Sequence, residues 1–239
     1  MAADTAWIGI DIGTRGVRTA AHGADGRLLA EASIDRPPRL PGPGRMTHDP
    51  ERDWWGSSVD ALRAMAPTLE GLDVAGVGLA GLFPAVALVG ADGIATTEGI
   101  LHGDSRATAD VEQVEAAIGV RLSGDEVSPR LAWLRDHEPA AIQGADVALG
   151  PAGYVGRRLT GVDSIDPHSA VRWGFQLVDG DDWRREDLEA LGLPTRLLPP
   201  IRRPGEVIGT VSAEAARSTG LRWLRRMRCW PSWAAAARR

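Results

Sequence analysis

The 239-residue sequence contains no lysine, so every basic side chain is an arginine, and it contains a single cysteine. One cysteine excludes a disulfide framework and any zinc site built from several thiolates. The formal net charge of −5 excludes the strongly basic surface that nucleic-acid binding requires. Hydrophobic residues make up 44% of the chain, which is enough for a core and excludes disorder over most of the length. The first residues, MAADTAWIGIDIG, lack the basic start and long apolar stretch of a signal peptide, so we expect a cytoplasmic location.

Residues 221–239 differ in composition from the rest of the chain. They hold six arginines, three of the nine tryptophans, the cysteine and no acidic residue. Residues 1–220 therefore contain 21 of the 27 basic residues and all 32 acidic residues, which gives them a net charge of −11. Three interpretations stay open: a short basic amphipathic helix, an ordinary final helix, or out-of-frame translation of GC-rich DNA. The abundance of Arg, Ala and Trp favours the out-of-frame interpretation for this tail.

One stretch of 18 residues, 74–91, carries no charge and is long enough to cross a bilayer as a helix. Several glycines and Pro84 interrupt it, and valine-rich runs flank the proline. We therefore predict two buried strands, at about 74–80 and 85–89, and no membrane contact.

Strands come first along the chain and then alternate with helices, which favours an α/β fold in one domain over residues 1–220. The predicted strands are residues 7–12, 17–22, 27–34 and 146–149, besides the two above. The predicted helices are about 50–66, 106–118, 129–137, 151–159, 183–191 and a last one after Ser212. Asp49 and Pro50 are typical of the cap and first residue of the first of these helices.

The densest chemical signal is the segment from Asp11 to Arg18, DIGTRGVR, in which a glycine-rich turn links two strands. Glycine lets backbone N–H groups approach phosphate oxygens, Thr14 can donate a hydrogen bond, and Arg18 supplies a forked positive charge. Asp11 could hold a magnesium ion through water. Because no helix follows and GxxxxGK is absent, the segment is not a Walker A loop. A plain β-hairpin with a glycine-rich turn remains the alternative.

The same segment resembles the first phosphate motif of the actin, hexokinase and heat-shock chaperone ATPase superfamily. More specifically, residues 7–220 resemble the N-terminal domain of the FGGY carbohydrate kinases, which phosphorylate sugars and polyols. Five further segments resemble family motifs in the family's order: Asp49–Trp55, Gly103–Arg106, Pro129–Leu134, Tyr154–Gly161 and Leu198–Gly209.

This resemblance implies an RNase H-like domain with a mixed sheet and flanking helices, facing a related C-terminal domain across a cleft. In the family, ATP and Mg²⁺ bind in that cleft, mostly against the C-terminal domain, and the sugar binds mostly against the N-terminal one. The implied activity is ATP-dependent phosphoryl transfer to an alcohol group of a small sugar or polyol, with a catalytic Asp taking the proton.

Carried over by position, Asp11 would be the carboxylate on the magnesium side of the cleft. Gly13, Thr14, Arg15 and Arg18 would contact phosphate. Arg15 departs from the pattern, because relatives often have Thr or Ser there.

Carried over in the same way, Asp104 and Arg106 would help shape the substrate site, together with Phe83 and His102. The alternative for Asp104 and Arg106 is a surface helix start capped by the aspartate. Relatives often carry polar residues where this chain has Gly81–Ala85, GLFPA, and His102 stands where they have Trp. The remaining histidines show no metal-ligand spacing: His22, His48, His137 and His168.

In the family, the catalytic Asp and the second domain follow the last helix, whereas here the resemblance stops near Gly220 and the tail contains no Asp. We therefore expect no catalytic residue in this chain, which would be the N-terminal half of a kinase, inactive alone, with a C-terminal domain missing or a homo-oligomer formed. The alternative function is a non-catalytic sugar- or phosphate-binding module. An actin-like ATPase fits less well, because Trp54-Trp55 and Leu159–Gly161 resemble the kinases.

Overall fold

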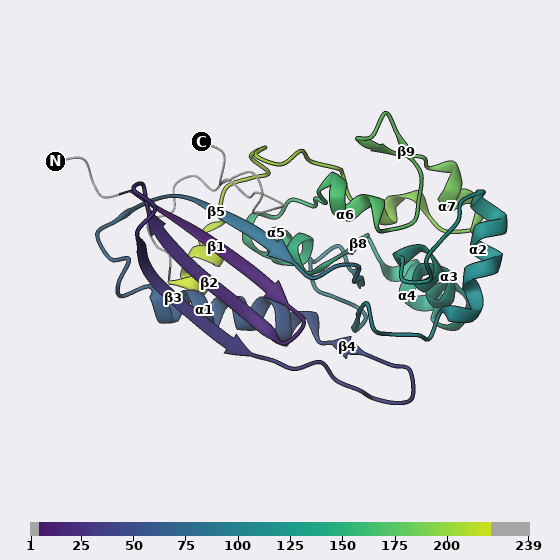
Figure 1. Ribbon diagram of the computed structural model, residues 1–239, viewed down its shortest axis with the longest axis horizontal. Helices are drawn as coiled ribbons and strands as arrows, with labels where there is room; N and C mark the ends of the chain where they lie inside the picture. The colour runs from purple at the N-terminus through teal and green to yellow at the C-terminus, as the bar shows by residue number, and fades with distance from the viewer. Residues whose placement is uncertain (1–4, 221–239) are drawn as a thin grey trace.

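The computed structural model describes residues 5–220, and a four-stranded sheet forms one end of it (Figure 1). Strands β1 (Thr5–Gly13), β2 (Gly16–Gly23) and β3 (Leu28–Asp35) form an antiparallel meander. Strand β5 (Asp73–Gly81) pairs with β1 in parallel, which gives the order β3-β2-β1-β5. The sheet is therefore mixed, as expected.

Alternating side chains of β1 give the sheet one buried face. Ala6, Ile8, Ile10 and Ile12 are at most 2% exposed, whereas the residues between them are partly or fully accessible. This period of two is the pattern of a strand with one face against a core. Helix α1 (Ser57–Met65) lies against β2 and β3, and the π-helical segment η1 (Pro50–Gly56) before it lies against β2 (Figure 1).

The helix predicted for residues 50–66 is confirmed, with its first turns wider than an α-helix. The side chain of Asp49 accepts a hydrogen bond from the Arg52 N–H at 3.0 Å, and Pro50 is the first residue, as predicted. Trp54, Leu62 and Met65 from this segment are almost completely buried.

Short strands connect the sheet to the rest of the chain. Strand β4 (Thr47–His48) pairs with β7 (Gly99–Ile100), and β6 (Ala87–Val89) pairs with β8 (Val147–Leu149). Residues 74–91 thus form two strands, as predicted, and no helix among residues 5–220 is long and apolar enough to cross a membrane.

The other end of the molecule is mainly helical (Figure 1). Its elements are η2 (Thr108–Asp110), α2 (Val111–Ile118), α3 (Val127–His137), α4 (Pro139–Gly144), α6 (Pro167–Val171), β9 (Leu177–Val178), β10 (Asp182–Trp183), α7 (Glu186–Ala190) and η3 (Thr195–Leu197). Helices α5 (Pro151–Thr160) and α8 (Ala213–Thr219) return to the sheet, and Ser212 caps α8 as predicted.

The helix predicted for residues 183–191 is wrong over its first residues. Trp183 lies in β10 opposite Leu177, and the helix spans only Glu186–Ala190. The reason is tertiary: the Trp183 side chain is buried, and its indole N–H donates to the Pro199 carbonyl at 2.7 Å.

Two groups of buried apolar side chains form the core. The sheet cluster joins β1, β2 and β5 to α1, α5 and α8, and its members run from Ala6 to Ala215. The helical cluster runs from Val86 to Leu198 and includes Trp133, Trp173 and Trp183.

Candidate functional site

The carboxyl ends of β1 and β5 lie at the same edge of the sheet, because the two strands are parallel. The Leu82 N–H donates to the Ile12 carbonyl at 2.8 Å, so residues 82–85 begin beside the turn that follows β1. Ligands of α/β folds bind at such strand ends. This edge therefore brings together the predicted phosphate turn and Phe83.

The phosphate turn, residues 13–16, is a tight hairpin between β1 and β2. Asp11 lies opposite Arg18 in register, with 3.9 Å between Oδ2 and Nη1. Their side chains are 45% and 75% exposed, so this ion pair contributes little to stability and leaves both groups accessible. Gly16 has φ +147°, and a β-carbon there would lie 2.1 Å from the Ile34 carbonyl oxygen, so only glycine fits.

Two hydrogen bonds hold the carbonyl groups of this turn. The Thr14 carbonyl accepts from the His48 ring at 3.1 Å, and the Arg15 carbonyl accepts from the Arg36 N–H at 2.8 Å. His48 belongs to β4, whose partner β7 leads into residues 101–106. The turn is thereby linked to the segment that carries the other predicted substrate residues.

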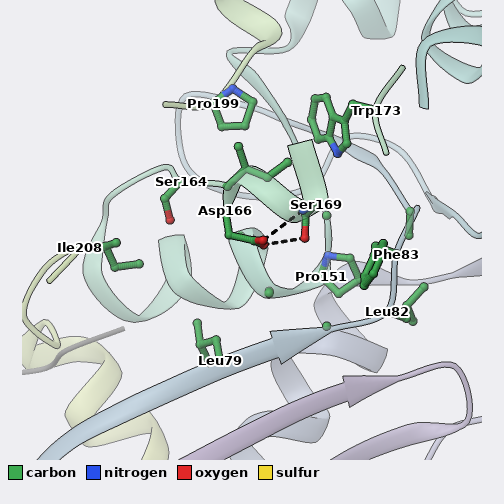
Figure 2. A pocket seen from close by; sticks show the side chains of 16 residues that line it. Leu79, Leu82, Phe83, Pro151, Ser164, Asp166, Ser169, Trp173, Pro199 and Ile208 are labelled. Carbon is green, nitrogen blue, oxygen red and sulfur yellow. Dashed lines mark hydrogen bonds between the residues drawn. The ribbon is translucent and has the colours of Figure 1, made fainter. Parts of the chain in front are cut away.

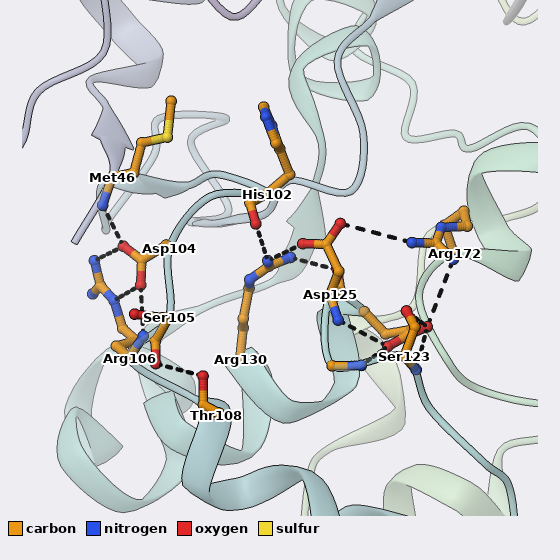
Figure 3. Close-up of polar contacts among 12 residues, drawn as sticks. Met46, His102, Asp104, Ser105, Arg106, Thr108, Ser123, Asp125, Arg130 and Arg172 are labelled. Atoms are coloured by element: carbon orange, nitrogen blue, oxygen red, sulfur yellow. Dashed lines mark hydrogen bonds and ion pairs between the residues drawn. The ribbon is translucent and has the colours of Figure 1, made fainter. Parts of the chain in front are cut away.

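Asp104 is a buried anchor in that segment (Figure 3). Its Oδ1 accepts from the N–H and Nε of Arg106 at 3.1 and 2.8 Å, and its Oδ2 accepts from the Met46 N–H and Arg106 Nη2, both at 2.8 Å. Burial opposes ionisation of the Asp104 carboxyl, but these hydrogen bonds and the Arg106 charge outweigh it and hold its pKa below the ordinary value. The carboxylate therefore joins residue 46 to residues 104–106.

A second buried cation fixes the loop of His102. The Arg130 side chain is 2% exposed and donates to the His102 carbonyl at 3.2 Å and to Asp125 Oδ1 at 2.9 Å. The His102 ring points away from Arg130 (Figure 3) and is exposed. The Arg106 guanidinium lies 5.0 Å from the centre of the Trp133 ring. The hydrogen bond from Arg130 thus fixes the His102 backbone and leaves its ring accessible.

Phe83 lies beside a narrow apolar cavity (Figure 2). Its ring is 43% exposed and meets the His168 ring edge-on at 5.3 Å. The cavity has a volume of about 40 Å³, well short of the several hundred Å³ of a ligand pocket. Inside it, Asp166 accepts hydrogen bonds from the N–H and hydroxyl of Ser169 at 3.0 and 2.5 Å. The cavity is therefore too small to enclose a sugar.

Within residues 5–220, no three His, Cys, Asp or Glu side chains gather as a metal site. Asp11 is nonetheless suited to a water-mediated magnesium ion, because it is half-exposed and its ion-pair partner lies 3.9 Å away. Mg²⁺ is commonly bound by one or two carboxylates plus substrate phosphates.

Sequence reasoning missed His48. It contacts Trp54 and the Thr14 carbonyl, the latter 34 positions away along the chain. The position of His48 directly before the helix cap Asp49 is the one local signal, and it does not identify these partners.

The mixed sheet, its flanking helices and the turn after β1 define a fold of the actin and hexokinase type. The model of the FGGY family of carbohydrate kinases, N-terminal domain, matches residues 6–223. The chain belongs to the FGGY family of carbohydrate kinases.

Individual relatives agree with this assignment. The xylulose kinase of Escherichia coli K12 is 27% identical over 222 residues, which cover 90% of this chain and 46% of that protein. The crystal structure of xylulose kinase from Rhodospirillum rubrum superposes with a TM-score of 0.83 at 27% identity, over 94% of this chain and 48% of the other. Gluconate kinase from Lactobacillus acidophilus, at 21% identity and a TM-score of 0.85, has the same fold. The chain spans about half the length of the curated relatives it matches.

Proposed function

We propose that this chain is the sugar-side half of an ATP-dependent carbohydrate kinase, which transfers a phosphoryl group to an alcohol of a small sugar or polyol. The observation that carries the proposal is the family match over residues 6–223 together with the edge that unites the phosphate turn, Phe83 and the His102 loop. Magnesium and ATP would supply the transferable phosphoryl group and charge neutralisation.

At the nucleotide side, Asp11 would orient a magnesium-bound water, and Thr14 and Arg18 would donate hydrogen bonds to phosphate oxygens. Gly13 allows close backbone approach, and the Arg15 side chain, which is exposed, would add positive charge. These groups would bind and orient phosphate at the start of a cleft.

At the sugar side, Phe83 and the His102 ring would contact the substrate, while Asp104 and Arg106 would position the loop between them. Deprotonation of the attacking hydroxyl requires a base, and Asp104 cannot serve, because its carboxylate already accepts four hydrogen bonds. The family resemblance places the catalytic Asp in the C-terminal half of the kinase. We therefore expect no turnover by this chain alone and full activity only with the second half that its relatives possess.

The test measures ATP consumption with xylulose, gluconate and glycerol in a coupled assay, and binding of each sugar and of magnesium–ATP by calorimetry. We expect weak binding, lost for magnesium–ATP in Asp11→Asn, and no turnover. Asp25→Asn is the matched control, since Asp25 lies in the glycine-rich turn at the opposite end of β2. Turnover that Asp11→Asn abolishes would contradict the inactivity, and absence of all binding would contradict the kinase role.

A second candidate is a sugar- or phosphate-binding module without catalysis. The observation favouring it is that Asp104, the buried carboxylate of the predicted substrate site, already accepts four hydrogen bonds and is not free to act as a base. A sugar affinity that is unchanged by magnesium–ATP and by the Asp11→Asn substitution would support this alternative.

A further inference from the structure

His48 is a buried histidine whose two ring nitrogens are both engaged. Its exposure is 1%, its Nδ1 lies 2.9 Å from the indole nitrogen of Trp54, and its Nε2 lies 3.1 Å from the Thr14 carbonyl oxygen. An indole N–H can only donate, so His48 Nδ1 accepts. The ring is then neutral, with its proton on Nε2, and donates to the carbonyl of the phosphate turn.

The surroundings of His48 keep the ring neutral. Burial lowers its pKa, the nearby charge of Asp53 and the hydrogen bond with Thr14 raise it, and the charges of Arg39 and Arg52 lower it again, with a net shift downward. A protonated ring would also point a second N–H at the indole N–H of Trp54. The Nε2-protonated form is therefore the one that this site accommodates.

Trp54 is in turn held rigidly from other sides. It is 0% exposed, its ring meets that of Tyr154 edge-on at 5.8 Å, and a β-carbon at Gly99 would lie 2.3 Å from it. The indole therefore cannot turn away from His48 without moving β7 or α5.

The hydrogen bond to Thr14 fixes one peptide plane of the phosphate turn. In a trans peptide the C=O and the following N–H point in opposite directions. With the Thr14 carbonyl directed at buried His48, the N–H of Arg15 is directed away from His48. Backbone N–H groups of such turns are the donors that bind anions.

We propose that His48 is a positioning residue of this kinase half: through the tautomer imposed by Trp54 it aims the Arg15 N–H at the phosphate of the nucleotide. This inference rests on the proposed nucleotide role of the turn. It adds a residue that touches no substrate but sets the direction of a backbone donor.

The experiment compares His48→Gln and His48→Ala in the full chain. Glutamine can accept from Trp54 and donate to Thr14 as histidine does, whereas alanine does neither. We expect His48→Gln to retain the wild-type chemical shift of the Arg15 amide, and His48→Ala to move it. Magnesium–ATP should bind His48→Ala about threefold to tenfold more weakly, as for one lost hydrogen bond.

A second pair of variants separates positioning from general stability. Trp54→Phe removes the indole donor to His48, and Trp183→Phe removes an equally buried indole donor in the helical cluster. Long-range ¹H–¹⁵N spectra should show the Nε2–H tautomer in the wild type and in Trp183→Phe. In Trp54→Phe, the His48 pKa should rise, because Nδ1 can then take a proton without an opposing donor.

The outcomes are distinct. A His48 ring in the Nδ1–H form, or an Arg15 amide unchanged in His48→Ala, overturns this inference whether or not nucleotide binds. A wild-type Arg15 amide that does not respond to magnesium–ATP, with the His48 tautomer as expected, counts instead against the proposed function of the turn.

Discussion

Replacement of Asp104 by asparagine should destabilise the fold severely. An asparagine amide replaces one carboxylate oxygen by NH₂, and each oxygen of Asp104 accepts two hydrogen bonds from Met46 or Arg106. In either orientation of the asparagine amide, its NH₂ group therefore faces two N–H donors and can accept a hydrogen bond from neither. Arg106, whose side chain is 7% exposed, also loses its counter-charge. Breaking a buried pair of this kind costs about 3–5 kcal/mol.

Urea unfolding followed by tryptophan fluorescence and circular dichroism measures this loss. The control is Asp25→Asn, because the Asp25–Arg27 pair is 3.9 Å apart and about 70% exposed, which is worth at most about 1 kcal/mol. An Asp104→Asn protein within about 1 kcal/mol of the control would refute the reasoning.

The pH dependence supplies a second check on Asp104. Its folded pKa lies below the ordinary value near 3.8, so its ionisation stabilises the fold above that pH. This contribution is lost as the pH falls through the folded pKa. The difference in free energy of unfolding between the wild type and Asp104→Asn should accordingly become smaller below about pH 4.

Three further predictions concern other parts of the molecule. Gly16→Ala should lower the free energy of unfolding, measured in urea, by at least about 2 kcal/mol. The control Gly26→Ala should lower it by about 1 kcal/mol, because Gly26 has φ +81° but open space around it, and equal losses would contradict the steric argument. Burial and the Glu51 carboxylate raise the pKa of Tyr154, the single tyrosine, to about 12, so ultraviolet titration of the folded protein should show ionisation near that pH. Because the unfolded tyrosine ionises near pH 10, the free energy of unfolding should fall as the pH rises above 10. Arg130→Lys should lose about 1–3 kcal/mol, because one ammonium cannot reproduce the fork to two carbonyls and a carboxylate; a melting curve like that of the wild type would oppose this.

Local pattern was sufficient to predict the sheet. The alternation in β1, the glycines of its turns and the Pro84 break after β5 each act on neighbouring residues, so the four strands were predicted within a residue or two. The caps Asp49 and Ser212 were also predicted correctly, because a cap bonds to backbone three residues away.

The geometry of the candidate site could not be predicted, because it depends on contacts between residues far apart in the sequence. The partner of Asp104 at Met46 lies 58 positions away, and that of Arg130 at His102 lies 28 positions away. The family motif marked Asp104 and Arg106, but only the structure shows that they bind each other and the backbone. The error at Trp183 has the same origin, since a distant carbonyl decides its conformation.

The membership of the sheet cluster has a consequence for synthesis on the ribosome. Ala6 in β1 is among its first residues to be made and Ala215 in α8 is its last, so the cluster closes only after nearly the whole described chain exists. At about 5–20 residues per second, the sheet cluster waits roughly 10–40 s for α8, which packs against α1 and α5. The nascent chain thus presents an incomplete core to chaperones until α8 is made, and ribosome-bound chains ending before α8 should remain sensitive to protease in α1 and α5.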